Sequence, residues 1–224
     1  MDLETYKATF SEEDTPGWAA IDDKLAEIYG GGEPDFHFGT IIKFALGGPD
    51  PIDGVSVYKR LEPSPHLHYV SYGMSSLYYD EESAGGEFSK WGFEFTFRLA
   101  VAAEDMPASD KDVPLWPISV MQNLARYVFE TQKWFEQFHF IPANGPIKLK
   151  SDTKMVAMLF CLDPELGSME TPHGKVDFLQ MVGLTQDEID ALLAKTYRAT
   201  ELVDALSRGN PLLITDLARS ANAL

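Results

Sequence analysis

Apolar and polar residues alternate over residues 92–102, and this alternation predicts a strand with one buried face. The apolar face consists of Phe93, Phe95, Phe97 and Leu99. Residues 17–29 instead repeat apolar side chains every three or four positions, as on one side of a helix. Three glycines follow at 30–32, so we expect a helix over 17–29 that ends there.

Other apolar runs predict further strands, interrupted by two helical regions. Strands are expected at 38–46, 55–58, 66–72, 155–162, 175–182 and 212–214. Pro117 is typical of a first helical turn and predicts a helix to about residue 138. Thr185 and Glu188 form a capping-box pattern, which predicts helical structure from there to about residue 208. Residues 80–90 and 103–114 are expected to be loops.

The order of these elements indicates an α+β fold, because helices and strands neither alternate strictly nor form separate halves of the chain. We expect a mixed or mainly antiparallel sheet covered by helices. The length of 224 residues suits one large domain. Residues 1–14 are polar and are expected to be a flexible N-terminus, with 15–224 as a single domain.

The charge of the chain restricts the partners that it can bind. There are 35 acidic and 18 basic residues, for a net charge of −17. This charge opposes direct binding to nucleic acids and to anionic membranes, and it favours a basic protein partner. The simpler alternative is that the acidic residues only keep the protein in solution.

The sequence predicts a cytoplasmic location. No apolar run approaches the roughly 18 residues of a membrane-spanning helix. The acidic start of the chain, residues 1–4, lacks the layout of a signal peptide. A single cysteine, Cys161, excludes an internal disulfide bond and fits a reducing compartment.

His66 and His68 are the residues that most resemble a chemical site. Two positions apart on a strand, they face the same side, where they can bind a metal ion or act in a hydrolase-like enzyme. A metal site would need further ligands, and the sequence selects none. We favour a structural role for both histidines, in hydrogen bonds to neighbouring loops.

No other pattern predicts catalysis. The chain has no G-x-S-x-G, H-E-x-x-H, C-x-x-C or phosphate-binding glycine loop. Cys161 lies in an apolar strand, so we expect a buried, inert thiol. We therefore predict no enzyme activity, no catalytic residue and no cofactor.

Four further residues are candidates for binding. Asp50 and Asp53 lie in a loop rich in glycine and proline, where their carboxylates can hold a turn, bind a cation or contact a partner. Tyr78 and Tyr79 precede an acidic stretch and can anchor a partner protein, because interfaces favour tyrosine. Ordinary turn formation and packing are the simpler interpretations of all four.

Several segments resemble motifs of the Suppressor of fused family, in the same order along the chain. The most informative is the irregular stretch LGGPDPIDGVSVY at residues 46–58. HLHYVSYGMSSLY at 66–78 is similar to the family's HWHYISFGLSDLY, and GFEFTFRL at 92–99 to GFELTFRL. WP at 116–117, LARYVF at 124–129, TPHG at 171–174 with FLQ at 178–180, and LITD at 213–216 also match. Together they cover about residues 15–219.

The resemblance implies the fold of the amino-terminal lobe of the eukaryotic protein and a role in protein binding rather than catalysis. In that family a partner peptide lies as a strand between two lobes, so this chain alone is not expected to form the same clamp. One contact tyrosine of the family corresponds to Tyr127. Single-lobe bacterial members resemble immunity proteins, so a basic toxin is one expected partner. A scaffold or oligomer-forming adaptor is the remaining alternative.

Overall fold

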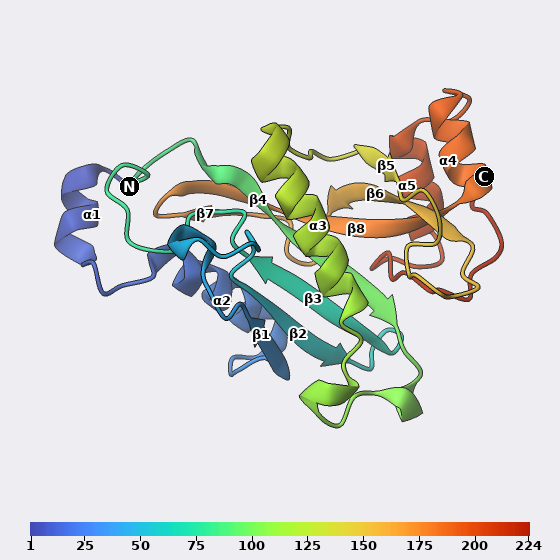
Figure 1. The fold of residues 1–224 in the computed structure, drawn as a ribbon, viewed down its shortest axis with the longest axis horizontal. Coiled ribbons are helices and arrows are strands. Elements are labelled where there is room, and N and C mark those ends of the chain that lie inside the picture. The colour runs from blue at the N-terminus through green and yellow to red at the C-terminus, as the bar shows by residue number, and fades with distance from the viewer.

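The computed structural model describes residues 1–224, with the exception of the Ala45 side chain. One sheet of eight strands forms its centre (Figure 1). The strands are β1 Phe36–Gly39, β2 Gly54–Arg60, β3 His66–Tyr72, β4 Phe88–Ala100, β5 Phe140–Pro142, β6 Met155–Leu162, β7 Ser168–Thr171 and β8 Gly174–Thr185. The helices are α1 Leu3–Thr9, α2 Pro16–Tyr29, α3 Trp116–Thr131, α4 Gln186–Leu193 and α5 Ala199–Ser207. Three short 3₁₀ turns are η1 Phe44–Leu46, η2 Ala103–Asp105 and η3 Asp110–Asp112.

The sheet is mixed and mainly antiparallel, which confirms the predicted α+β class. Its strand order is β1-β2-β3-β4-β8-β6-β5, and β7 pairs with the first part of β8. Only β4 and β8, at the centre, run parallel among the described pairs. β4 and β8 shift register between Phe88 and Phe93, where Lys90 and Gly92 adopt positive φ angles.

Helices cover both faces of the sheet (Figure 1). α3 packs on one face, and its buried side chains join the main apolar core formed by the central strands. The four predicted apolar residues of β4 all lie in this core. α2 covers one end of the opposite face, and α4 and α5 cover its other end.

Several predicted elements have different limits. The strand expected at 38–46 ends at Gly39, and the chain then forms the turn η1. The helix from Pro117 ends at Thr131, because Gln132 takes a left-handed conformation. The helical region after Thr185 divides into α4 and α5. The run 212–214 forms no strand beyond one bridge between Leu99 and Thr215.

Residues 1–14 contain α1, a helix that the sequence analysis did not predict. Asp2 caps it, because its carboxylate accepts a hydrogen bond from the backbone N–H of Thr5 at 2.8 Å. Tyr6 is buried, and its hydroxyl lies 2.8 Å from Nε2 of His173. The packed side chain of Tyr6 therefore attaches α1 to the turn between β7 and β8, whereas the division into a flexible N-terminus and one domain stays a prediction.

None of the described helices is long and apolar enough to cross a membrane.

Candidate functional site

Aromatic side chains gather around the carboxyl end of α3, next to the start of β4. We call this set the aromatic surface; it consists of Phe88, Trp91, Tyr127, Phe129, Trp134 and Phe135. The ring centroids of Trp91 and Phe129 are 5.4 Å apart, and those of Tyr127 and Phe135 are 5.8 Å apart. Tyr127 is 38% exposed, Trp134 52% and Phe88 54%. Exposed aromatic groups of this kind are typical of protein interaction sites.

A first hollow of about 600 Å³ lies within the aromatic surface. Phe88, Trp91 and Trp134 line it together with residues from the start of β8. It forms where β4 and β8 lose register, because the intervening residues bulge out of the sheet. The indole N–H of Trp91 is buried there without a hydrogen-bond partner. The hollow therefore combines aromatic walls with charged side chains from β8 and from the segment after α3.

A second hollow, of about 340 Å³, lies beside the first and contains three of the predicted binding residues. Asp53, Tyr78 and Tyr79 all line it. The Tyr78 hydroxyl donates a hydrogen bond to Oδ2 of Asp53 at 2.8 Å, whereas Oδ1 of Asp53 is buried without a partner. Phe44 and Phe129 complete its aromatic walls. The structure thus brings together residues from two loops and a helix.

Lys90 lines both hollows and connects them. Its Nζ donates a hydrogen bond to the carbonyl of Gly73 at 2.7 Å and lies 4.8 Å from the centroid of the Phe129 ring. Burial lowers the pKa of Lys90, while the nearby carboxylates of Glu94 and Asp53 oppose that shift. Lys90, which is exposed as a whole residue, therefore places a cation between the two hollows.

Asp50 takes a different position from Asp53. Its carboxylate pairs with the guanidinium of Arg126 on α3, and both side chains are partly exposed. Asp50 lines a third hollow, of about 390 Å³, together with residues from the amino-terminal half of α3. The two aspartates of the loop therefore do not form a carboxylate pair for one cation.

The strand β5 provides a free edge close to the aromatic surface. β5 pairs only with β6 among the described strands. Phe135 stacks on Phe160 of β6 with ring centroids 4.4 Å apart, and the Phe138 N–H donates to the carbonyl of Phe160 at 2.7 Å. The segment between α3 and β5 thus links Tyr127 to this edge.

His66 and His68 are fully buried on the opposite face of the sheet, far from solvent. Nδ1 of His66 donates to the carbonyl of Ser64 at 2.7 Å, as expected for a histidine that holds a neighbouring loop. Nδ1 of His68 lies 2.5 Å from the Tyr29 hydroxyl, and its Nε2 lies 3.0 Å from a carboxylate oxygen of Asp163. Both rings therefore contact protein groups at both nitrogens.

These histidines belong to a buried polar cluster that the sequence analysis missed. The polar cluster consists of His66, His68, Thr96, Arg98, Asp163 and Gln180, all of which are buried. Arg98 donates to Asp163 at 3.0 Å, to Gln180 at 3.3 Å and to Nε2 of His66 at 3.1 Å. The sequence contained one indication of this cluster, an arginine among the alternating polar residues of a strand. Nothing in the sequence showed that the polar face of this strand is covered by other parts of the chain.

The protonation of this cluster follows from its burial and its charges. Burial and the charge of Arg98 lower the pKa of His68 to about 4, although Asp163 opposes the shift. Burial alone would raise the pKa of Asp163, but His68 and Arg98 hold it well below its usual range. The cluster is therefore an ion pair of Arg98 and Asp163 with neutral histidines at neutral pH.

No metal-binding group of three or more histidine, cysteine or acidic side chains occurs within the part of the chain that the structure describes. Cys161 is buried, as predicted, and burial raises the pKa of its thiol to about 12. His66, His68 and Cys161, which the sequence suggested as possible reactive or metal-binding groups, are thus enclosed. The accessible candidates for binding are the residues around the two hollows.

Comparison with known proteins identifies the family. A family described as "Suppressor of fused protein (SUFU)" matches residues 48–220. The chain belongs to the Suppressor of fused family. Suppressor of fused homologues from Homo sapiens and from Mus musculus are each 35% identical to it over 217 residues. The match covers 91% of this chain and 43% of each relative, so the chain spans less than half of their length.

Solved structures of the family have the same fold. A crystal structure described as the Sufu–Fu complex has a TM-score of 0.84 and 30% identity, covering 94% of this chain and 93% of that one. A crystal structure of Drosophila Suppressor of Fused has a TM-score of 0.83 and 31% identity, covering 95% of this chain and 52% of that one. The predicted family and fold class are both confirmed.

Proposed function

We propose that this chain is a protein-binding module that holds an extended segment of a partner protein on the aromatic surface and along β5. The observation that carries the proposal is the set of exposed aromatic rings around a hollow of about 600 Å³. Family membership supports it, and a structural relative is described as a complex of Sufu with Fu. Tyr127, the residue that corresponds to a contact tyrosine of the family, lies on this surface.

Strand addition to β5 would place the partner segment next to these rings. An unpaired strand edge offers main-chain donors and acceptors, and neighbouring pockets then select side chains. The free edge of β5 is short and ends at Pro142, which has no N–H to donate. Main-chain bonding along three residues is weak by itself, so the aromatic surface supplies most of the affinity.

We further propose that the chain is a bacterial immunity protein that neutralises a basic toxin in the cytoplasm. The net charge of −17 supports a basic partner, since complementary charge speeds the encounter and suppresses wrong partners. Binding rather than catalysis is proposed because His66 and His68 are fully buried and the thiol of Cys161 is enclosed.

Capture of partners from a lysate of the source organism tests the binding proposal. The wild-type chain is compared with Trp134→Ala, which removes an exposed ring whose indole N–H donates to Glu136 at 3.0 Å. Leu149→Ala is the matched control, because Leu149 is 81% exposed and lies outside the aromatic surface. We expect one stoichiometric partner that Trp134→Ala loses and Leu149→Ala retains. A partner retained equally by both variants would place binding elsewhere.

A toxin-neutralisation assay tests the immunity role. Growth of cells that express a toxin encoded beside this chain is measured with and without the chain, and with Trp134→Ala. Rescue by the wild type but not by the variant is expected. A chain that neither binds nor neutralises such a toxin would reject the immunity role and leave the binding role standing.

A further inference from the structure

We propose that the second hollow binds a cationic side chain, preferably arginine, of the partner protein. The inference rests on the proposed function, because it specifies the chemistry of a residue in the partner segment. It concerns Asp53, Tyr78 and their neighbours, whereas the proposed function depends on the aromatic surface around the first hollow. The two hollows adjoin at Lys90, so one extended segment can reach both.

The walls of the second hollow combine aromatic faces with negative charge. Tyr78, Tyr79, Phe44 and Phe129 supply rings, and Asp53 and Asp80 supply carboxylates. The two carboxylates differ in what they can still accept. Asp80 already accepts hydrogen bonds from the Glu82 N–H at 3.0 Å and from the Ser83 hydroxyl at 2.5 Å.

Asp53 carries the unused hydrogen-bonding capacity of this hollow. Tyr78 orients its carboxylate through Oδ2, while Oδ1 is buried and has no partner in the protein. A buried carboxylate oxygen without a donor is costly, and a donor from a ligand recovers that cost once the ligand displaces the side chains that cover Oδ1. Because the missing partner must be a donor, a guanidinium, which carries only donors, fits better than a neutral amide, which also carries an acceptor.

The chain's own lysines show that these rings accept cations. Nζ of Lys43 lies 4.2 Å from the centroid of Tyr78, and Nζ of Lys90 lies 4.8 Å from the centroid of Phe129. Lys43 belongs to the exposed turn after β1, and no ion pair holds it among the described residues. An incoming guanidinium can replace Lys43 over the ring, since arginine stacks on aromatic faces and carries several donors.

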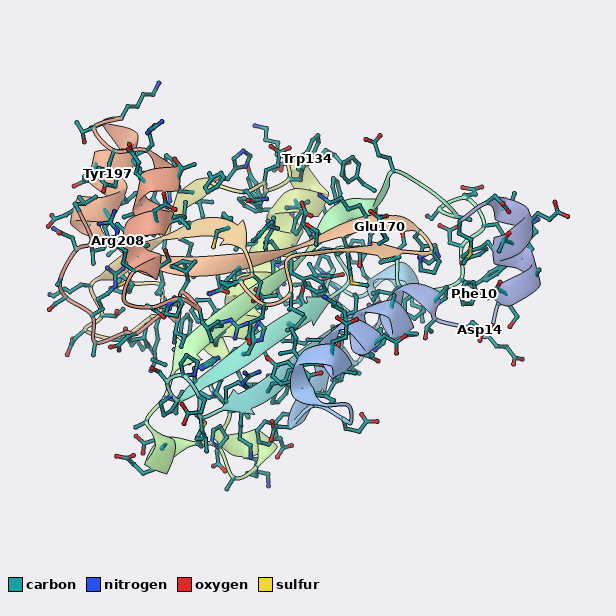
Figure 2. All side chains as sticks on the ribbon, turned by 180° about the vertical axis from the view of Figure 1, so that it is seen from behind. Phe10, Asp14, Trp134, Glu170, Tyr197 and Arg208 are labelled. Carbon is teal, nitrogen blue, oxygen red and sulfur yellow. The ribbon has the colours of Figure 1, made fainter. Side chains whose placement is uncertain are left out.

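The surroundings of the hollow attract positive charge. Residues 1–14 and 80–87 contain nine acidic residues and one basic residue, Lys7. Both segments meet at Tyr79, whose N–H donates to the carbonyl of Asp14 at 3.2 Å and whose hydroxyl donates to Glu81 at 2.8 Å. Figure 2 shows Phe10 and Asp14 at this end of the molecule, beside α1. The acidic end therefore raises the local concentration of basic segments next to the hollow.

Titration with small peptides, followed by NMR spectroscopy, tests the inference without the natural partner. The probes are acetyl-Gly-Arg-Gly-amide and the same peptide with citrulline, which has nearly the shape of arginine but no charge. We expect saturable shifts of Asp53 and Tyr78 resonances with the arginine peptide at millimolar concentration, and none with the citrulline peptide. Equal binding of both peptides, or no saturable shift with either, would overturn the proposal.

Variants locate the site. Asp53→Asn keeps an acceptor for Tyr78 but removes the charge, and we expect about tenfold weaker binding of the arginine peptide, the loss of one charge-assisted hydrogen bond. Asp50→Asn is the matched control, because Asp50 lies in the same loop but outside the second hollow, and it should bind as the wild type does. Equal affinity of Asp53→Asn and the wild type would refute the role of Asp53.

Lys43→Ala tests the site by a gain of affinity, which misfolding cannot imitate. If Lys43 occupies the ring that arginine takes, its removal should tighten the arginine peptide by about threefold. Unchanged or weaker binding would argue against displacement of Lys43. If neither peptide binds but Trp134→Ala still fails to capture the partner, this inference is wrong and the proposed function stands. Peptide binding without any effect of Trp134→Ala would instead reject the proposed function alone.

Discussion

The two faces of β4 differ in chemistry although both are buried. On one face, Phe93, Phe95 and Phe97 pack against α3 and its neighbours in the apolar core. On the other, Glu94, Thr96 and Arg98 are equally enclosed, with relative exposures of 0%. The alternating pattern of a strand therefore separates two kinds of side chain, but it does not say which face meets water.

The two faces also use burial differently. Close packing of the apolar face tolerates no loss of volume, because a cavity costs both transfer free energy and contacts. The polar face depends on complete hydrogen bonding, since each buried charge needs its partners. Glu94, for example, accepts hydrogen bonds from the side chains of Ser71 and Ser75 and from three backbone N–H groups at 73–75. Five substitutions, on β4 and on the neighbouring strand β3, separate these two modes.

Phe95→Ala should have the largest effect. Phe95 is fully buried, and its ring lies near those of Phe93, Phe135 and Phe160. Its removal is expected to lower the free energy of unfolding by about 3–5 kcal/mol, measured by denaturant titration. Phe88→Ala, on the exposed start of the same strand, is the control and should cost less than about 1 kcal/mol. Similar losses for both variants would contradict the assignment of the buried face.

Arg98→Met should follow, because it leaves the Asp163 carboxylate buried without its ion pair. We expect a loss of about 3 kcal/mol, at the lower end for a broken buried pair, since Thr96 and two backbone N–H groups still bond Asp163. Arg198→Met, in an exposed pair with Glu201, should leave stability unchanged. In a double-mutant cycle with Asp163→Asn, the combined loss should be clearly smaller than the sum. An additive result would mean that the pair is not coupled.

Acid should weaken the polar face through His68. Its pKa is about 4 in the folded chain and about 6.5 when unfolded, so the unfolded state binds more protons between these values. The stability that the fold has with a neutral His68 is fully present above about pH 6.5. It is lost as the pH falls toward 4, because the folded state resists protonation of His68. The loss is on the order of 3 kcal/mol, since each unit of pKa difference corresponds to about 1.4 kcal/mol.

The variant His68→Gln isolates this effect. It removes the titrating group, so the free energy of unfolding should change less between pH 6.5 and 4 than in the wild type. Burial raises the pKa of Glu94, which gives the opposite trend, but that contribution is common to both proteins and cancels in the difference. Parallel pH curves for the two proteins would exclude His68 as the source.

Two tyrosines on opposite faces of β3 should give the smallest effects. The Tyr69 hydroxyl, on the α3 face, donates to the carbonyl of Pro114 at 2.9 Å, and the Tyr72 hydroxyl, on the other face, donates to the carboxylate of Asp22 at 2.8 Å. Replacement by phenylalanine should cost about 1 kcal/mol for each, and more for Tyr72 because its acceptor is a carboxylate. Thermal unfolding measures both, and a larger loss for Tyr69 would reverse the ranking.

Much of the fold could be predicted because it depends on local pattern. The limits of β3 and β6 agree with the predicted runs, and Thr185 and Glu188 form the expected capping box. Short strands such as β5 and β7 escaped prediction, since three or four residues carry too little periodicity. The end of α3 also escaped, because its termination by Gln132 in a left-handed conformation has no glycine to signal it.

The candidate site was predictable only in part. Asp53, Tyr78 and Tyr79 were selected from the sequence one by one, but their common hollow also needs Lys90 and Phe129 from distant elements. Trp91 and Trp134 carried no signal that separates them from core residues. Asp50 and Asp53 looked equivalent in the sequence, and only the packing of α3 assigns them to different hollows.

The sequence by itself determined where most of the longer helices and strands form, which side of β4 is apolar, and the family to which the chain belongs. These properties follow from neighbouring residues, whose spacing and turn chemistry act over a few positions. The tertiary structure decided what covers the polar side of β4 and which side chains surround the two hollows. Those contacts join residues far apart in the chain, and their energies depend on burial, which exists only once the layers have packed.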